Sequence, residues 1–247
     1  MWAICVKEIR SFFSSLMGYI VIAVILVTMG LMMWVFPDYS VLDNVYASLD
    51  QLFVLAPMLF VFLIPAITMR SFADENQNGT IELLATRPLR DREIIIGKFL
   101  ACLILVVIAL IPTALYYYTV YQLGSPPGNL DSGGIFGAYI GLFFLAASFV
   151  SIGVFASALS NNQVVSFILA TFLCFFFYWG FQFISRLPVF VGKWDDFVQH
   201  FGIDLHYFSM SRGLVDSRDL IYFLSVIFLF LFFTFMSLDS RKWEKSA

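Results

Sequence analysis

Long stretches without Asp, Glu, Lys or Arg constrain this chain more than any other feature. They cover residues 11–37, 51–69, 99–130, 132–185 and 220–238. A helix needs about 20 apolar residues to cross the hydrocarbon core of a bilayer. The fourth stretch is too long for one helix, and the polar residues 160–163 divide it in two. The sequence therefore predicts six spans, near residues 18–36, 51–70, 95–121, 135–158, 164–184 and 219–238.

The composition agrees with a polytopic membrane protein. Hydrophobic residues make up 61% of the chain, charged residues 13%, and the mean hydropathy is +0.89. The segments between the spans are too short to bury a core of their own. We therefore expect an all-α integral membrane fold in which residues 1–247 form a single transmembrane domain.

The distribution of basic residues predicts the orientation. Cytoplasmic segments carry an excess of Lys and Arg. The loops 37–50 and 122–134 contain neither, whereas segment 185–218 holds four. The other ten gather where one side of a six-span protein would place them: Lys7, Arg10, Arg70, Arg87, Arg90, Arg92, Lys98, Arg241, Lys242 and Lys245. With six spans, we expect both termini in the cytoplasm.

The N-terminal sequence MWAICVKEIRSFF has apolar residues at positions 2, 5, 6, 9, 12 and 13, with charges between them. This pattern is typical of an amphipathic helix that lies on a membrane surface. Because Lys7, Glu8 and Arg10 precede a full-length span and no cleavage site follows, we expect no signal peptide. Cys5, Cys102 and Cys174 lie in spans or on the cytoplasmic side, so we expect no disulfide framework.

Enzymatic chemistry is not indicated. The spans are expected to hold no buried ionisable residue, which argues against an ion pump. The sequence has no G-x-S-x-G and no H-E-x-x-H motif, and a Walker A loop is missing because Gly97-Lys98 and Gly192-Lys193 are followed by Phe and Trp. We expect no catalytic residue, no metal and no cofactor in this chain. If ATP drives the protein, another chain binds ATP-Mg.

One polar stretch, residues 75–98, interrupts the apolar sequence. Residues 80–86 favour a short helix with Ile81, Leu84 and Ala85 on an apolar face and Glu82 on the polar side. Such a helix at the mouth of a span fits a docking element that passes a partner's movement into the membrane. An ordinary loop helix anchored among lipid headgroups fits equally well.

Pro88 ends this helix in the prediction. Asp91 is then expected to cap the next helix, with Glu93 in its first turn, where the helix macrodipole favours acids. That helix leads directly into the third span.

The same stretch resembles the signature E…GT[LI]ELL.T.P…EI..GK of ABC-2 type transporter permeases. The matching residues are Glu75, Gly79, Thr80, Ile81, Glu82, Leu83, Leu84, Thr86, Pro88, Leu89, Glu93, Ile94, Gly97 and Lys98. The resemblance implies six spans, an N-terminal interfacial helix, a coupling helix between spans two and three, and partly embedded outer-face helices between spans five and six.

The resemblance also implies partners. Two permeases pair, and each rests on a separate ATPase subunit that receives the coupling helix. The implied contact residues are Glu75, Gly79, Thr80, Glu82, Leu83, Leu84 and Thr86. Weaker candidates are Lys7, Glu8 and Arg10 in the N-terminal helix, with Asn161 and Gln163 in the loop after the fourth span. Membrane lipids are the remaining expected partner, and no nucleic acid is expected.

Within that family the pattern KEI.SFF…GY and the short, Phe-rich chain are similar to gliding-motility permeases of the GldF type. This similarity implies a GldA-like ATPase and either a GldG-like second permease or a homodimer. One departure is visible: many members have P-V-S-R after the coupling helix, whereas this chain has Pro88-Leu89-Arg90-Asp91. The start of the third span, and the choice of ATPase, can differ accordingly.

Two further patterns leave alternatives open. Gly133, Gly137 and Gly141 form a ladder of small residues that allows close helix packing, either within one subunit or between two permeases. In segment 185–218, His200 and His206 with nearby carboxylates could hold a metal, but a separation of six residues is unfavourable on one helix face. The apolar and aromatic positions of that segment instead predict helices that are partly embedded in the outer face of the membrane.

Three functional classes are consistent with the sequence. The first is an ATP-driven exporter of a hydrophobic or amphipathic substrate. The second is a permease that relays ATPase work to an envelope machine without moving a solute. The third is a membrane scaffold without ATP coupling. An apolar lining does not distinguish a lipid pathway from a closed lumen.

Overall fold

The computed structural model describes residues 1–43, 47–79, 90–126, 128–188, 192 and 194–244, which form helices joined by turns and short loops. Six helical stretches within these residues are long and apolar enough to cross a membrane, which confirms the predicted number. They are Leu16–Trp34, Asp50–Gln77, Asp91–Leu123, Ser132–Leu159, Gln163–Ser185 and Ser217–Ser240. The largest difference from the prediction is the second stretch, which continues to Gln77 instead of ending near residue 70.

Several of these stretches consist of more than one element. In chain order the elements are α1 (Trp2–Ser14), α2 (Leu16–Trp34), η1 (Pro37–Tyr39), η2 (Val41–Asp43), α3 (Asp50–Thr68), α4 (Arg70–Gln77), α6 (Asp91–Leu110), η3 (Ile111–Thr113), α7 (Ala114–Leu123), α8 (Ser132–Leu159), α9 (Gln163–Phe175), the π-helical turn η4 (Phe176–Gly180), α10 (Phe181–Ser185), α11 (Asp195–Gln199), α12 (Ile203–Ser211) and α13 (Ser217–Glu244).

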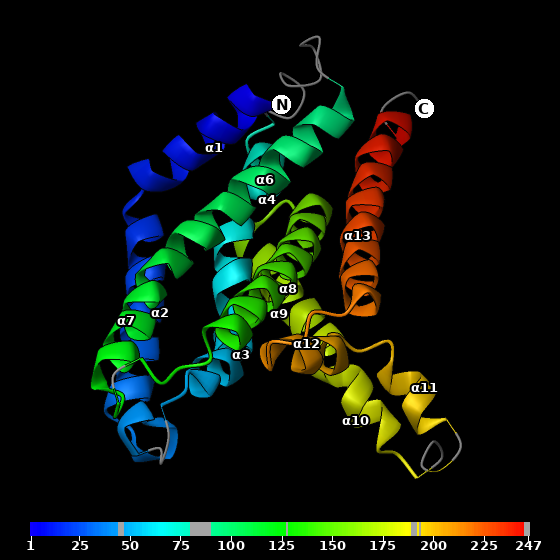
Figure 1. The fold of residues 1–247 in the computed structure, drawn as a ribbon. Helices are drawn as coiled ribbons and strands as arrows, with labels where there is room; N and C mark the ends of the chain where they lie inside the picture. Colours follow the sequence, from blue (N-terminus) through cyan, green and yellow to red (C-terminus); the bar gives the residue numbers. More distant parts are fainter. Residues whose placement is uncertain (44–46, 80–89, 127, 189–191, 193, 245–247) are drawn as a thin grey trace.

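The two ends of the bundle differ in what they carry. The N-terminus, the C-terminus, α1 and α4 lie at one end, which is the upper end in Figure 1. The chain returns at the opposite end through α10, α11 and α12 before α13 runs back. We call these the terminal end and the distal end. The short helices α11 and α12 fall within segment 185–218, where outer-face helices were predicted.

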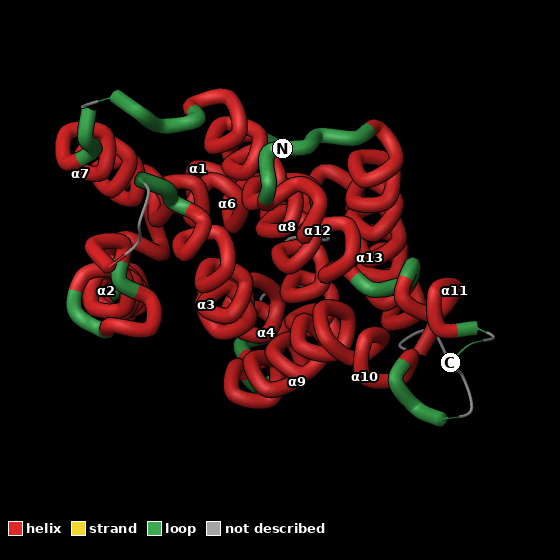
Figure 2. Tube along the Cα trace, turned by 60° about the horizontal axis from the view of Figure 1, so that its bottom comes forward, coloured by secondary structure: helices red, strands yellow, loops and turns green. Residues whose placement is uncertain are grey.

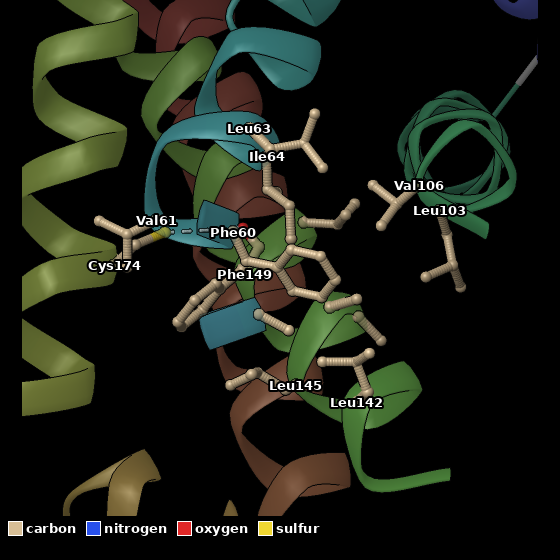
Figure 3. Packing of buried hydrophobic residues seen from close by; sticks show 14 of the residues in the cluster. Phe60, Val61, Leu63, Ile64, Leu103, Val106, Leu142, Leu145, Phe149 and Cys174 are labelled. Carbon is tan, nitrogen blue, oxygen red and sulfur yellow. Dashed lines mark hydrogen bonds between the residues drawn. The ribbon is translucent and has the colours of Figure 1, made fainter. Parts of the chain in front are cut away.

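Helix α8 occupies the middle of the bundle and packs against α3, α6, α9, α12 and α13. Figure 2 shows α3 and α8 inside the bundle, with α2, α9 and α13 around them. The contact layer is apolar, with Phe60 of α3, Val106 of α6 and Phe149 of α8 buried in one cluster (Figure 3). Because lipid tails are as apolar as these side chains, close packing rather than escape from water holds the helices together.

The peripheral spans show the complementary pattern. In the most apolar window of α2, 17% of residues are buried inside the protein, against 78% in that of α8. Large exposed side chains such as Val27 in α2, Ile168 in α9 and Phe228 in α13 fit a surface that faces hydrocarbon. The exposed apolar side chains of these helices therefore form a surface suited to contact with lipid tails.

The continuation of the second span has a specific cause. The helix breaks between Thr68 and Arg70, and Ser157 of α8 reaches into the break. Its hydroxyl accepts hydrogen bonds from the backbone N–H groups of Phe72 (2.9 Å) and Ala73 (3.0 Å), and donates one to the carbonyl of Met69 (3.1 Å). A side chain from another helix thus caps α4, whose first N–H groups would otherwise lack partners.

The start of the third span corrects one prediction. Helix α6 begins at Asp91, so the N-cap position belongs to Arg90 and Asp91 is the first helical residue. The reason is local: the Glu93 carboxylate accepts a hydrogen bond from the backbone N–H of Arg90 at 3.3 Å. An acid in the first turn that reaches back to the N-cap residue replaces a capping Asp side chain.

Candidate functional site

The predicted docking helix lies outside the residues that the structure describes. Thr80, Glu82, Leu83, Leu84 and Thr86 all fall in the range 80–89. The described chain before it ends α4 at Gln77, and Gly79 follows with a φ of +67°. That left-handed conformation is a frequent helix terminator because glycine lacks a Cβ. The site can therefore be built from the two helices that flank the range, α4 and α6.

An ion cluster joins these two helices. The Nζ atom of Lys98 in α6 lies 3.0 Å from Oε1 of Glu75 in α4. The same Nζ lies 2.9 Å from Oε1 of Glu8 in α1. Lys7 of α1 completes the group, with its Nζ 3.1 Å from Oε1 of Glu75. Three helices that are distant in sequence thus meet through four charged side chains, which we call the clamp.

Lys98 is the centre of the clamp. Its side chain is only 1% exposed, and it belongs to a membrane-spanning helix, where a buried charge is unusual. The ammonium also donates to the carbonyl of Ser71 and lies 5.0 Å from the ring centre of Phe72. Three acceptors match the three N–H donors of an ammonium group. The expectation that the spans hold no buried ionisable residue is therefore wrong at Lys98, where two carboxylates compensate the buried charge.

Gly97 explains how α1 comes close enough to take part. An ideal Cβ at this position would lie 3.0 Å from the Met1 carbonyl oxygen and 3.2 Å from Cβ of Ile4. A larger residue would push α1 away from α6. The Gly97-Lys98 step thus combines two functions: the glycine admits α1, and the lysine pairs with Glu8 on it.

Two side chains of α1, Lys7 and Cys5, have raised pKa values beside the clamp. Burial opposes the charged form of Lys7, but the Glu8 and Glu75 carboxylates outweigh it and raise the pKa of the ammonium above 10.5. Burial, followed by the Glu8 carboxylate, raises the pKa of the Cys5 thiol. Lys7 therefore stays charged at neutral pH, and Cys5 stays a thiol instead of a reactive thiolate.

The opposite side of α4 is held by the α8–α9 connection. Besides the Ser157 cap, Asn76 donates to the carbonyl of Ser160 at 2.9 Å, and Gln163 donates to the Asp74 carboxylate. Helix α4 is consequently fixed on two sides, by charges from α1 and α6 and by polar contacts from α8 and α9. It is the element at which four other helices converge.

The structure brings together four of the predicted site residues and separates two others. Lys7, Glu8 and Glu75 meet in the clamp, and Gln163 binds the same helix from the other side. Arg10 and Asn161 are exposed to the surroundings. Glu75 is 8% exposed and faces Lys98 and Lys7, so its carboxylate serves contacts within the chain.

Sequence reasoning missed Lys98, Ser157 and Asp74 as site residues. A signal for Lys98 was present, because it stands inside the family signature and at the start of an apolar span. The sequence patterns indicate a cytoplasmic basic residue of the signature and exclude a Walker A lysine, but they do not predict a buried ion pair. Nothing in the local sequence distinguishes Ser157 from the other serines of α8, since its role comes from the break in α3.

The glycine ladder lies at the distal end. An ideal Cβ on Gly137 would lie 2.5 Å from the carbonyl oxygen of Gly213, and one on Gly141 would lie 2.6 Å from Cβ of Met210. Both glycines face α12 and the turn after it in the same chain. Gly133 does not, because its nearest neighbour is Asp131 at 3.5 Å.

The two histidines also lie at the distal end. The Nδ1 atom of His206 in α12 is 2.7 Å from Oδ1 of Asp219 in α13, and the ring stacks on Tyr222. His200 contacts His206 through its backbone carbonyl. Within the described part of the chain, no group of three His, Cys, Asp or Glu side chains could hold a metal ion.

A bundle of six apolar helices with a charged clamp at one end defines a polytopic membrane protein. Comparison with known families makes the class more specific. Residues 2–189 match the family described as ABC-2 family transporter protein. No curated protein matches the chain.

Because the match covers more than half of the chain, the protein belongs to the ABC-2 family of transporter proteins. It is the membrane-embedded part of an ABC transporter, and the family implies a separate ATP-binding subunit as its partner. The matched range contains α1 to α10, and so includes every residue of the clamp.

Proposed function

We propose that this chain is a permease subunit that receives the work of a separate ABC ATPase through residues 80–89 and the clamp. The observation that carries the proposal is the contact of Lys98 with Glu75 and Glu8, because it ties together the two helices on either side of residues 80–89. Without this contact, a force applied to residues 80–89 would move α4 and α6 independently of each other.

The clamp suits such a role mechanically. Helix α4 continues the second span and α6 begins the third, so an ion bridge between them makes the pair respond as one body. Helix α1 joins the same body through Glu8 and Lys7. Packed helices move by small shear displacements or hinge at breaks. The Ser157-capped break between α3 and α4 is where we expect the displacement to enter the bundle.

We assign the ATPase contact to Gly79, Thr80, Glu82, Leu83, Leu84 and Thr86. Glu75 then acts as a positioning residue that holds the docking segment through Lys98. We assign the binding of ATP-Mg to the partner, and we assign no catalytic, metal-binding or cofactor-binding role to the described residues of this chain. Residues 1–247 form a single permease domain with both termini in the cytoplasm and the spans in a bacterial inner membrane.

The finer assignment is a gliding-motility transporter of the GldF type. It rests on the N-terminal pattern KEI.SFF and the short, Phe-rich chain. A GldA-like ATPase and either a GldG-like permease or a second copy would complete the assembly. The complex would drive export or remodelling of the envelope. In a second form of the proposal, the permease relays mechanical work without moving a solute.

Capture of the ATPase tests the proposal. The tagged full chain carrying Glu82→Lys and Leu84→Asp is isolated from its native membranes, and the co-purified ATPase is detected by ATP hydrolysis and by mass spectrometry of its Walker A peptide. We expect at least about a tenfold loss of ATPase, because a buried charge pair and an apolar anchor at an interface each contribute strongly. Membrane insertion should persist.

A matched control carries the same chemical changes at the distal end, at the exposed positions Asp196→Lys and Leu214→Asp. It should retain the ATPase. Equal recovery from both variants would contradict the docking assignment, and absence of any ATPase from the wild-type sample would favour the scaffold class. Stimulation of ATP hydrolysis by a lipid substrate in the reconstituted complex would separate an exporter from a mechanical relay.

A further inference from the structure

The distal end contains a cluster that the coupling role does not use. His206 of α12 lies among three groups: the Asp219 carboxylate at 2.7 Å, the backbone carbonyl of His200 at 3.1 Å, and the Tyr222 ring, whose centre is 3.9 Å away. The imidazole and the Asp219 side chain are only 13% and 11% exposed. The cluster is therefore built into the interior of this end of the protein.

The hydrogen-bond partners of His206 fix the number of protons that it shares. Its Nδ1 faces a carboxylate oxygen and its Nε2 faces a carbonyl oxygen, and both of these are acceptors. A neutral imidazole has one N–H donor and one bare nitrogen. With a neutral ring and an ionised Asp219, one ring nitrogen would have no proton, and its lone pair would face the lone pair of an acceptor oxygen, which is repulsive. The geometry requires one more proton, held between the ring and the carboxylate.

The cluster links three elements of the distal end. Asp219 and Tyr222 belong to the first turns of α13, His206 belongs to α12, and the carbonyl acceptor belongs to the turn between α11 and α12. The Tyr222 hydroxyl donates to the carbonyl of Phe201 in that same turn at 2.7 Å. A planar cation stacked on an aromatic ring gains further attraction from its π face.

We propose that His206, Asp219 and Tyr222 form a protonation-dependent latch that fastens α12 and the turn before it to the start of α13. With the shared proton in place, both ring nitrogens of His206 donate and the latch is closed. When the proton leaves, a carboxylate or a carbonyl faces a bare nitrogen, and α12 is released from α13. The latch therefore weakens as the pH rises and the shared proton leaves.

Other charged groups near α12 do not supply this response. From its own helix, Asp204 contacts Tyr178 of η4 and lies near Arg186, and burial raises the pKa of its carboxyl against those two partners. The contact of α8 with this region is made by Gly137 and Gly141, which carry no titratable group. From α3, the backbone carbonyl of Phe53 accepts the Tyr207 hydroxyl. The groups that face His206 itself are the Asp219 carboxylate, the Tyr222 ring, and His200, which contributes its backbone carbonyl and an imidazole ring whose centre is 6.3 Å from that of His206.

Hydrogen exchange of the full chain in lipid nanodiscs tests the latch. The opening of residues 200–211 is compared at about pH 5.5 and about pH 8.5, with peptides of α8 as the internal reference for the intrinsic change in exchange rate. In the wild type we expect about tenfold more frequent opening at the higher pH, in line with the loss of one charge-assisted hydrogen bond.

The chain has two histidines, which provides a matched pair of variants. His206→Gln should abolish the pH step. His200→Gln should keep it, because the hydrogen bond from His200 to His206 uses the backbone carbonyl and the His200 ring only meets the His206 ring edge-on at 6.3 Å. Asp219→Asn tests the same pair from the other side and should also abolish the step. A wild type without a pH step, or a step that survives both His206→Gln and Asp219→Asn, would overturn the proposal.

Discussion

The two ends of this membrane protein are held by different kinds of charge. At the terminal end the clamp joins α1, α4 and α6 through Lys and Glu side chains, with Lys98 buried at its centre. At the distal end α12 meets α13 through a histidine, a carboxylate and a tyrosine ring. The terminal joint is thus built from ammonium and carboxylate groups, whereas the distal joint depends on an imidazole.

This difference indicates a division of roles. In the proposed function the clamp transmits force from an ATPase, and a joint of buried ion pairs between three helices suits that role. A joint at the other end can respond to its surroundings. Glycines reinforce the contrast: Gly97 brings α1 close to the clamp, whereas Gly137 and Gly141 bring the backbone of the α12 region against α8 with no charge involved.

The largest expected effect comes from removing the centre of the clamp. Lys98→Met removes the buried ammonium and leaves Glu8 and Glu75 with only the largely exposed Lys7 as a cation. Breaking a buried ion pair costs about 3–5 kcal/mol. The free energy of unfolding, measured by SDS titration in mixed micelles, should fall by that order, and recovery of the ATPase should fall with it. Adding Glu8→Gln and Glu75→Gln should restore most of the stability.

The matched control for Lys98 is Arg92→Met on the same helix. Arg92 is exposed, with its guanidinium 5.6 Å from the ring centre of Phe235, so the stability loss should stay below about 1 kcal/mol. Equal losses from the two variants would show that the clamp is not a buried joint.

An intermediate effect is expected from the glycine contact at the distal end. In Gly137→Ala the added methyl group meets the Gly213 backbone, which cannot rotate away like a side chain. Overpacking of this kind costs about 1–3 kcal/mol. The same unfolding titration should show the loss, while ATPase recovery stays unchanged. Gly133→Ala, whose new Cβ has room, should be nearly neutral in both measurements.

The smallest effect concerns the exposed member of the clamp. The Lys7 side chain is 59% exposed, and pairs of this kind contribute about 0–1 kcal/mol, so Lys7→Gln should cost little. The carboxylates raise the pKa of Lys7, so its contribution is present below its ordinary value of 10.5 and is lost only as the pH rises beyond it. The difference in stability between the wild type and Lys7→Gln should hence stay the same between about pH 6 and about pH 9. A clear change would mean that a different group controls this end.

The sequence predicted the spans well and the contacts between them poorly. Runs without charged residues located all six spans, because a segment must be long and apolar enough to cross the hydrocarbon core of the bilayer. The second span was predicted too short because polar residues after position 70 suggested a loop. Ser157, which lies far along the chain, supplies the cap that lets α4 continue there.

The candidate site divides in the same way. Glu75, Lys7 and Glu8 were selected from the sequence as residues of interest, but as contacts for a partner. The pairing of Glu8 and Glu75 with Lys98 could not be foreseen, since these three residues lie on three separate helices. Charge patterns along one helix can be read from spacing, whereas charge pairs between helices depend on how those helices pack.

By itself the sequence determined that this chain is a six-span membrane protein of the ABC-2 type, because hydropathy and a short signature are properties of local segments. Only the tertiary structure decided where the charges meet: at a buried lysine near the terminal end and at a histidine shared by two helices near the distal end. The physical reason is that an apolar segment enters a bilayer whatever its neighbours are, whereas a buried charge is stable only when specific partners from other helices lie within hydrogen-bond distance.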